Sequence, residues 1–156
     1  MKQIPSLRKH DQGERCVCGE NECNVSPLGR GEVILFLDID EAEGLTGRRC
    51  DCIIALKRAD NSREVFSVEL KSVRGQQVRE ALDPGKLIEK CVNCIRWLDS
   101  AKILARIDRR YCVLVVPENV VSLLNREKRR LISRARGNGI VDYRVIACGG
   151  SLTPET

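Results

Sequence analysis

The sequence predicts an α/β fold in which helices flank a mixed β-sheet. Three short apolar segments, rich in β-branched residues and separated by turn-forming residues, follow one another between residues 33 and 72. Beyond them, strand-like apolar segments alternate with segments whose apolar residues have helical spacing. Short turns favour antiparallel hairpins, whereas strands joined through helices run parallel with right-handed crossovers. The expected order of elements is therefore β-β-β-α-β-α-β.

The boundaries of these elements follow from local signals. Strands are expected over residues 33–39, 50–56, 65–72, 111–116 and 143–148. Helices are expected over residues 87–105 and 121–136. Pro117 ends the fourth strand, and Gly137 is expected to cap the second helix at its C-terminus. The sequence Asp83-Pro84-Gly85 is expected to interrupt regular structure before the first helix.

Length and composition indicate one domain. The chain has 156 residues, of which 42% are hydrophobic and 31% are charged, so it can bury a core. Residues 1–30 are expected to be mostly loop, residues 31–150 to form the α/β domain, and residues 151–156 to be a tail. No segment reaches the ~20 apolar residues of a membrane helix, and the first ten residues lack the apolar core of a signal peptide. An intracellular location is therefore expected.

The chain has nine cysteines, an odd number that cannot pair completely within one chain. Three of them lie in the N-terminal segment and, with one histidine, form a candidate second metal site: His10, Cys16, Cys18 and Cys23. Thiolate and imidazole are suitable ligands for Zn²⁺, and an iron–sulfur cluster, a disulfide or free thiols are the alternatives.

Four further cysteines lie in the expected helices and strands, where they are expected to be small core residues: Cys91, Cys94, Cys112 and Cys148. Disulfides between them stay open as an alternative, although intracellular disulfides are common mainly in hyperthermophiles.

The third expected strand carries a carboxylate and an ammonium group on one face. Side chains alternate along a strand, so Phe66, Val68 and Leu70 are expected to face the core, while Glu69 and Lys71 project from the other face. Taken alone, a Glu-x-Lys pattern on a strand is more often an exposed ion pair than part of a catalytic site.

Asp51 begins the second strand, which is otherwise apolar, and an acidic residue there is unusual unless it binds something. A hairpin between the second and third strands would bring Asp51 close to Glu69. Two adjacent carboxylates repel each other, and Mg²⁺ or Mn²⁺ would relieve that repulsion. Lys71 would then orient an attacking water or stabilise negative charge on a phosphate. These residues indicate a metal-dependent phosphodiesterase.

Asp51 followed by Glu69-Leu70-Lys71, on adjacent strands before a helix and a further strand, resembles the PD-(D/E)xK nuclease superfamily. The resemblance covers residues 33 to 117 and is closest in style to archaeal Holliday junction resolvases and RecB-type nuclease domains. It implies a restriction-endonuclease-like core that hydrolyses DNA and is compatible with a homodimer. It also implies that Asp51, Glu69 and the backbone carbonyl of Leu70 bind Mg²⁺ or Mn²⁺, while Lys71 assists the attacking water.

The sequence departs from the superfamily pattern at two points. Cys50 stands where the motif has proline. Members usually carry a metal-binding glutamate on a helix before the first strand, and here the candidates are Glu14 and Glu32, in a region that does not predict such a helix. Members also have a polar residue from the following helix near the site, for which Gln77, Lys86 and Lys90 are the candidates.

Basic residues on the two expected helices form a candidate DNA-binding surface. The net charge is +5, which suits a polyanionic partner, and aromatic residues make up only 3%, which disfavours a surface that stacks single-stranded bases. The candidate phosphate-binding residues are Lys86, Lys90, Arg126, Lys128, Arg129, Arg130 and Arg134. A solvated helix face explains the same pattern equally well.

Two other functions are compatible with the sequence. One is a nuclease-like module that binds nucleic acid or protein without cleaving it. The other is a cysteine-rich metal-binding protein in which the acidic residues are incidental. Asp38, Asp40 and Glu41, at the end of the first strand, are expected to form a solvated turn rather than to line the site.

Overall fold

The structure is a computed structural model of the 156-residue chain. It describes residues 16–17, 23–25, 31–39, 47, 49–71, 83–124 and 128–152.

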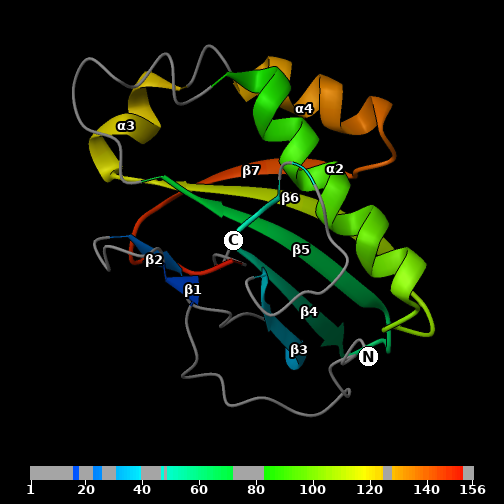
Figure 1. The fold of residues 1–156 in the computed structure, drawn as a ribbon. Helices are drawn as coiled ribbons and strands as arrows, with labels where there is room; N and C mark the ends of the chain where they lie inside the picture. Colours follow the sequence, from blue (N-terminus) through cyan, green and yellow to red (C-terminus); the bar gives the residue numbers. More distant parts are fainter. Residues whose placement is uncertain are drawn as a thin grey trace.

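A five-stranded mixed sheet forms the centre of the molecule (Figure 1). Its strands are β3 (Gly31–Asp38), β4 (Cys52–Arg58), β5 (Arg63–Leu70), β6 (Arg109–Val116) and β7 (Asp142–Ala147). They lie side by side in chain order. The pairs β3–β4 and β4–β5 are antiparallel, and the pairs β5–β6 and β6–β7 are parallel. The predicted fold class and order of elements are confirmed.

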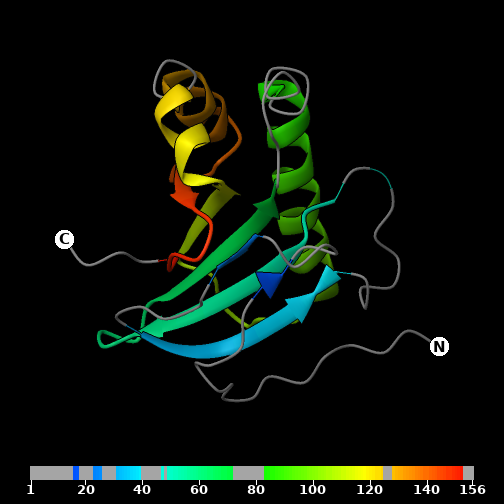
Figure 2. The ribbon, with the colours of Figure 1, turned by 90° about the vertical axis from the view of Figure 1, so that its left-hand side faces the viewer.

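Three described helices lie on one side of this sheet (Figures 1 and 2). They are α2 (Pro84–Ala101), α3 (Glu118–Leu123) and α4 (Lys128–Gly137). The sequence predicted helices that flank the sheet. Within the described part of the chain, however, the opposite face is covered by a two-stranded antiparallel sheet of β1 (Cys16–Val17) and β2 (Asn24–Val25), together with Leu152.

The helix predicted over residues 121–136 is two helices, and this prediction was wrong. Pro117 precedes α3, which suits proline because its fixed φ favours the start of a helix. The N–H of Leu124 donates to the carbonyls of both Val120 and Val121, at 3.2 Å each, where α3 ends. α3 therefore ends at Leu123 and α4 begins at Lys128, although the sequence between them contains no glycine or proline.

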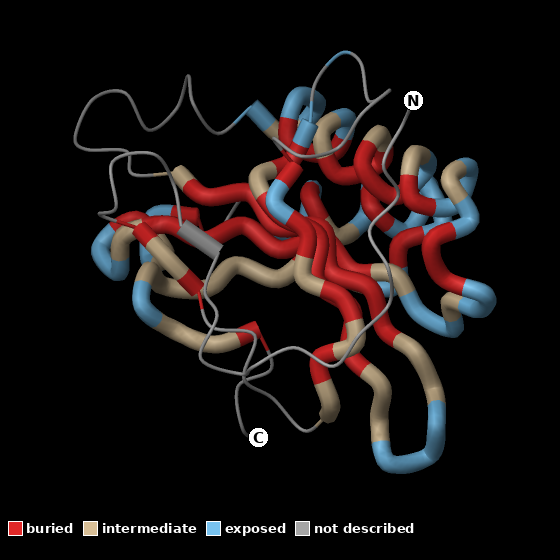
Figure 3. Tube along the Cα trace, turned by 60° about the horizontal axis from the view of Figure 1, so that its bottom comes forward, coloured by how far each residue is buried: buried red, intermediate tan, exposed pale blue. Residues whose placement is uncertain are grey.

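The two faces of the sheet bury separate apolar clusters, and most residues of β4, β5 and β6 are buried (Figure 3). On the helix side, Leu114 of β6 packs with Leu87 of α2 and Leu131 of α4. On the opposite side, Phe66, Val68 and Leu70 of β5 share one cluster, as the alternation in the sequence predicted. Burial of apolar surface on both faces explains why the central strands are so uniformly apolar.

Three disulfides join elements of the described chain: Cys23–Cys148, Cys50–Cys94 and Cys91–Cys112. Cys91, Cys94 and Cys112 are buried, as predicted for core residues, but they are crosslinked rather than separate thiols. Disulfides are typical of oxidising compartments and of intracellular proteins of hyperthermophiles. In the described residues, no helix is both long and apolar enough to span a membrane.

Cys23 and Cys148 bring β2 next to the segment that follows β7. The N–H of Gly149 donates to the carbonyl of Asn24 at 2.7 Å, and Leu152 is fully buried in the same cluster as Val25. Two segments 125 residues apart in sequence are therefore joined covalently, by a hydrogen bond and by apolar contact.

Both tyrosines of the chain are expected to resist ionisation while the protein is folded. Burial and a hydrogen bond to Glu64 raise the pKa of Tyr111, and burial raises the pKa of Tyr143. Because these pKa values exceed the ~10 of an unfolded tyrosine, the unfolded chain loses protons first, and stability falls as the pH rises above that value. Phenolate absorbance should therefore appear together with loss of the circular dichroism signal. Phenolate formed near pH ~10 with the fold intact would contradict the expectation.

Candidate active site

Asp51 and Glu69 lie on neighbouring strands at one end of the sheet. The antiparallel register pairs Cys52 of β4 with Val68 of β5. Asp51 immediately precedes β4 and its N–H donates to the carbonyl of the same Val68, so Asp51 lies beside the residue that precedes Glu69. The hairpin that the sequence predicted therefore does bring these two carboxylates together.

The backbone and carboxylate of Asp51 are both anchored to neighbouring strands. Its N–H donates to the carbonyl of Val68 at 2.8 Å, and its carbonyl accepts from the N–H of Ile39 at 3.1 Å. Its Oδ2 accepts a hydrogen bond of 2.7 Å from the N–H of Leu70. This last bond fixes the carboxylate of Asp51 against the end of β5.

Glu69 is buried, with only 7% of the residue exposed, yet its two oxygens have unequal partners. Lys90 Nζ of α2 donates to Oε1 at 2.9 Å, and Lys71 Nζ lies 3.5 Å from the same oxygen. Oε2 is buried without a hydrogen-bond partner among the described residues. A buried carboxylate oxygen without a partner is costly, and such an atom calls for an explanation.

Electrostatics oppose charge on both carboxylates. Burial raises the pKa of Asp51, against the hydrogen bond from Leu70 and the charges of the two lysines, and Asp38 adds a smaller upward contribution. Burial also raises the pKa of Glu69, and the negative charge of Asp51 raises it further. A cation placed between the two carboxylates would remove this repulsion. Raised pKa values of neighbouring acids are frequent at functional sites.

The two lysines of the site have opposite pKa shifts. Burial and the adjacent Lys90 lower the pKa of Lys71, although Glu69 opposes this effect. Burial is the largest influence on Lys90 and disfavours its charge, but the hydrogen bond to Glu69 and the charge of Glu69, with smaller contributions from Lys71 and Asp51, together outweigh burial and raise the pKa of Lys90. Lys90 is therefore the firmly charged member of the pair, and Lys71 is the one that releases a proton more easily.

The residues present fit a Mg²⁺ or Mn²⁺ ion. Such ions are commonly bound through one or two carboxylates, with waters and substrate phosphates supplying the other oxygens. Asp51 and Glu69 offer two carboxylates, and the orphaned Oε2 of Glu69 is an oxygen suited to the ion. The described residues contain no cluster of three or more histidine, cysteine or acidic side chains arranged to hold a metal. The protein would therefore contribute few of the ligands, among which the resemblance also implies the Leu70 carbonyl.

Lys90 is the residue of the following helix that reaches the site. From the sequence, Lys90 was one of three candidates for the polar residue that the following helix places near the site, with Gln77 and Lys86. It was also one of the candidate DNA-binding residues. Lys90 follows Leu87 by three residues and precedes buried Cys91, so it lies at the edge of the apolar face of α2. This position in the sequence indicated that Lys90 could reach the sheet, but its contact with Glu69 depends on how α2 is rotated on the sheet.

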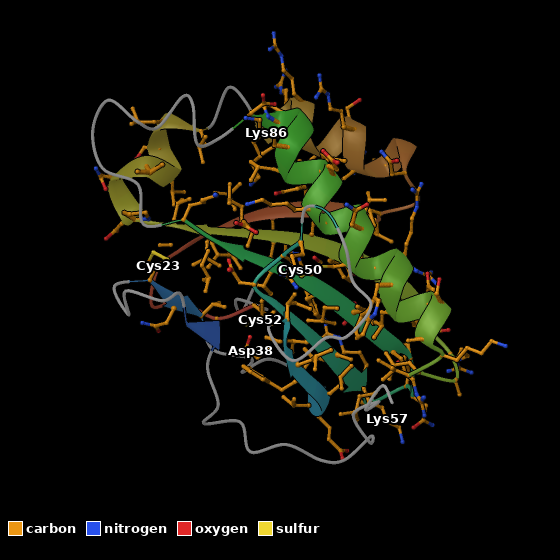
Figure 4. All side chains as sticks on the ribbon, viewed as in Figure 1. Cys23, Asp38, Cys50, Cys52, Lys57 and Lys86 are labelled. Carbon is orange, nitrogen blue, oxygen red and sulfur yellow. A yellow bond between two sulfur atoms is a disulfide. The ribbon has the colours of Figure 1, made fainter. Side chains whose placement is uncertain are left out.

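The other basic candidates extend away from Lys90 along α2 and α4. Lys86 is exposed one turn before Lys90, at the end of α2 near α4 (Figure 4). Arg134 of α4 approaches the same end, because its Nη1 lies 3.4 Å from the position that a Cβ on Gly85 would occupy. Three further candidates are exposed in the first turn of α4: Lys128, Arg129 and Arg130. Arg126 lies outside the described residues.

Several other candidates do not join the site. Cys23 forms a disulfide with Cys148, and a sulfur in a disulfide cannot act as a thiolate ligand, so Cys23 is removed from the proposed zinc set. Glu32 pairs with Lys57 at the opposite end of β3 from Asp38, which excludes it from the carboxylate pair. The side chain of Cys16 is not described, and six further candidates lie outside the described residues: His10, Glu14, Cys18, Asp40, Glu41 and Gln77.

Searches with family models, among curated proteins and among solved structures found no match for the chain.

Proposed function

We propose that the protein is a metal-dependent nuclease of the PD-(D/E)xK type that hydrolyses phosphodiester bonds in DNA. The observation that carries this proposal is the buried carboxylate of Glu69, which has an unpartnered oxygen and lies beside the half-buried carboxylate of Asp51. A merely structural ion pair between Glu69 and the two lysines would have no need for a second acid beside it, because the negative charge of Asp51 raises the pKa of Glu69 and so disfavours the ionised form that the pair requires. A site for a divalent cation explains both acids.

The residues of the site divide the work in the proposed reaction. Asp51 and Glu69 would hold Mg²⁺ or Mn²⁺, which lowers the pKa of a bound water and neutralises charge on the scissile phosphate. Lys71, whose pKa is lowered, would hold the attacking water and accept its proton more readily than an ordinary lysine. Lys90 would contact a phosphate oxygen and stabilise the negative charge that develops there.

The basic residues of α2 and α4 supply the binding surface for the substrate. Lys86 continues from Lys90 by one helical turn, and Arg134 lies at the same end of α2. A row of cations that leads away from the site suits the phosphate backbone, which is recognised by charge rather than by sequence. Structure-selective or nonspecific cleavage is therefore expected. A homodimer would allow both strands of a duplex to be cut.

Cleavage of labelled linear, flap and four-way-junction DNA with Mg²⁺ or Mn²⁺ tests the proposal. Lys71→Ala and Lys90→Ala should each lower the rate by about 10²-fold, because each removes a group that stabilises the transition state. Lys102→Ala is the matched control, since this exposed lysine caps the far end of α2. A chelator should abolish cleavage. If DNA is bound but no substrate is cut by the wild type, the chain is instead a nuclease-like binding module.

A further inference from the structure

Lys90 contacts Glu69 across the boundary between two layers of the fold. Lys90 belongs to α2, whereas Glu69 belongs to the sheet, and Lys90 Nζ lies 2.9 Å from Glu69 Oε1. The apolar residues beneath α2 hold it by non-directional contacts, which do not by themselves define its rotation or its position along its axis. A long lysine side chain also loses conformational entropy when it is held in one rotamer. A further interaction is therefore needed to fix the rotation and the axial position of α2 next to Lys90.

Two disulfides attach α2 to its surroundings at the position of Lys90. Cys91 is the next residue along the helix, and it is bonded to Cys112 of β6. Cys94 lies one turn further and is bonded to Cys50, the residue that precedes Asp51. The backbone N–H of Cys50 also donates to Cys94 Sγ, at 2.9 Å.

The two attachments approach the site from different sides. Cys112 pairs in register with Ser67, two residues before Glu69 on β5, so one crosslink connects α2 to the strand beside Glu69. The other connects α2 to the segment that carries Asp51. Two covalent anchors, one on β6 and one in the segment before β4, restrict both the rotation and the sliding of the helix.

We propose that the disulfides Cys50–Cys94 and Cys91–Cys112 are positioning elements that hold Lys90 on Glu69, in addition to stabilising the fold. Their sulfurs are buried, since the exposed fraction of each of these cysteines is 4% or less. A soluble thiol therefore has no direct access to them, and they act as permanent anchors of the site rather than as a rapid redox switch. For catalysis, this inference rests on the proposed nuclease function.

The third disulfide provides a matched control. Cys23–Cys148 joins β2 to the segment after β7, beside the sheet face that α2 does not cover (Figure 4). Its removal should cost stability without moving α2. The variants to compare are Cys50→Ala/Cys94→Ala, Cys91→Ala/Cys112→Ala and Cys23→Ala/Cys148→Ala, each at a temperature at which circular dichroism shows it folded. The two α2 variants are independent, so one still tests the proposal if the other does not fold.

The first readout does not depend on any nuclease activity. Acetylation of lysines by an N-hydroxysuccinimide ester, followed by mass spectrometry, measures how well Lys90 is protected by Glu69, with exposed Lys86 as the internal reference. The ratio of Lys90 to Lys86 labelling should rise severalfold when an α2 crosslink is removed and should stay at the wild-type value in Cys23→Ala/Cys148→Ala. An unchanged ratio in a folded α2 variant, or an equal rise in the control, would overturn the proposal.

The second readout is the rate of DNA cleavage. Loss of an α2 crosslink should lower the rate on the order of 10-fold, because a small displacement of a catalytic group is costly. The same loss in a Lys90→Ala background should have little further effect, since the crosslinks act through Lys90. Additive losses would show that they act elsewhere and would reject the proposal. If the wild type cleaves nothing, the nuclease function fails, while the labelling ratio still decides whether the crosslinks position Lys90.

Discussion

Glu69→Gln is expected to lower metal-dependent DNA cleavage by about 10³-fold, because it would remove one of the two carboxylates that we propose as metal ligands. The same substitution should raise the melting temperature measured without metal. The pKa of Glu69 is raised by burial and by Asp51, so its ionised form is less favourable in the folded chain than in the unfolded chain. Opposite effects on activity and stability are characteristic of residues retained for function. Steady-state cleavage assays and thermal melts measure the two effects.

Glu64→Gln is the matched control for this experiment. Glu64 is also a buried carboxylate of β5, but it lies on the opposite face, where it pairs with Arg58 and accepts a hydrogen bond of 2.8 Å from Tyr111 Oη. Its substitution should cost about 2 kcal/mol of unfolding free energy and leave cleavage near the wild-type rate. If Glu64→Gln and Glu69→Gln impaired cleavage equally, burial of charge in β5 would be the cause, and the assignment of Glu69 to a metal site would be wrong.

Cys23→Ala/Cys148→Ala is expected to lower the free energy of unfolding by about 4 kcal/mol, the largest stability effect that we expect for a single crosslink. Its cysteines are 125 residues apart, so the unfolded chain gains much conformational freedom when the bond is absent. The disulfides Cys50–Cys94 and Cys91–Cys112 lie within this loop, shorten its effective length and thereby reduce the gain. Denaturant unfolding monitored by circular dichroism under non-reducing conditions measures the difference.

Unfolding under fully reducing conditions separates the crosslink from side-chain packing. Wild type and variant then both lack disulfides, so their unfolding free energies should differ only by the packing of two small side chains. A difference that persisted unchanged in the reduced proteins would attribute the loss to packing in the cluster around Cys23, and the crosslink would contribute little.

The order of the strands in the sheet could be predicted because each strand has a recognisable pattern of apolar residues in its own sequence. Strand β5 alternates between Phe66, Val68 and Leu70 on one face and Glu69 on the other, and its neighbours are continuous apolar runs. Strands joined by short turns were expected to pair antiparallel, and strands joined through a helix were expected to pair parallel. The observed strand ends differ from the expected ones by at most two residues.

Helix ends were less predictable, since their signals are conformational. Asp83-Pro84-Gly85 was expected to interrupt structure, but Asp83 caps α2 by accepting a hydrogen bond of 2.8 Å from the N–H of Gly85, and Pro84 occupies the first turn. The helix ends before residue 105 because Lys102 adopts a left-handed conformation with φ of 53°. Lysine carries no preference for this conformation, so the sequence offered no signal.

The carboxylate part of the candidate site could also be predicted from the pattern of the strands. The proximity of Asp51 and Glu69 follows from the hairpin register, which sequence separation and strand periodicity define. The contact of Lys90 with Glu69 depends on the rotation of a helix over the sheet, and no local pattern specifies it. Disulfide connectivity likewise cannot be deduced from cysteine positions. The sequence therefore predicted which residues lie on neighbouring strands, but it did not predict the contacts and disulfides that join the helices to the sheet.

The joining of β2 to the segment after β7 imposes an order of events on a growing chain. Each strand from β4 to β7 pairs with the strand of the sheet that precedes it in the sequence, so the sheet can assemble as the nascent chain lengthens. Cys23 must wait for Cys148, which is synthesised 125 residues later. Throughout that interval its thiol can react with other cysteines of the unfinished protein. The correct crosslink therefore closes last, after synthesis has passed β7.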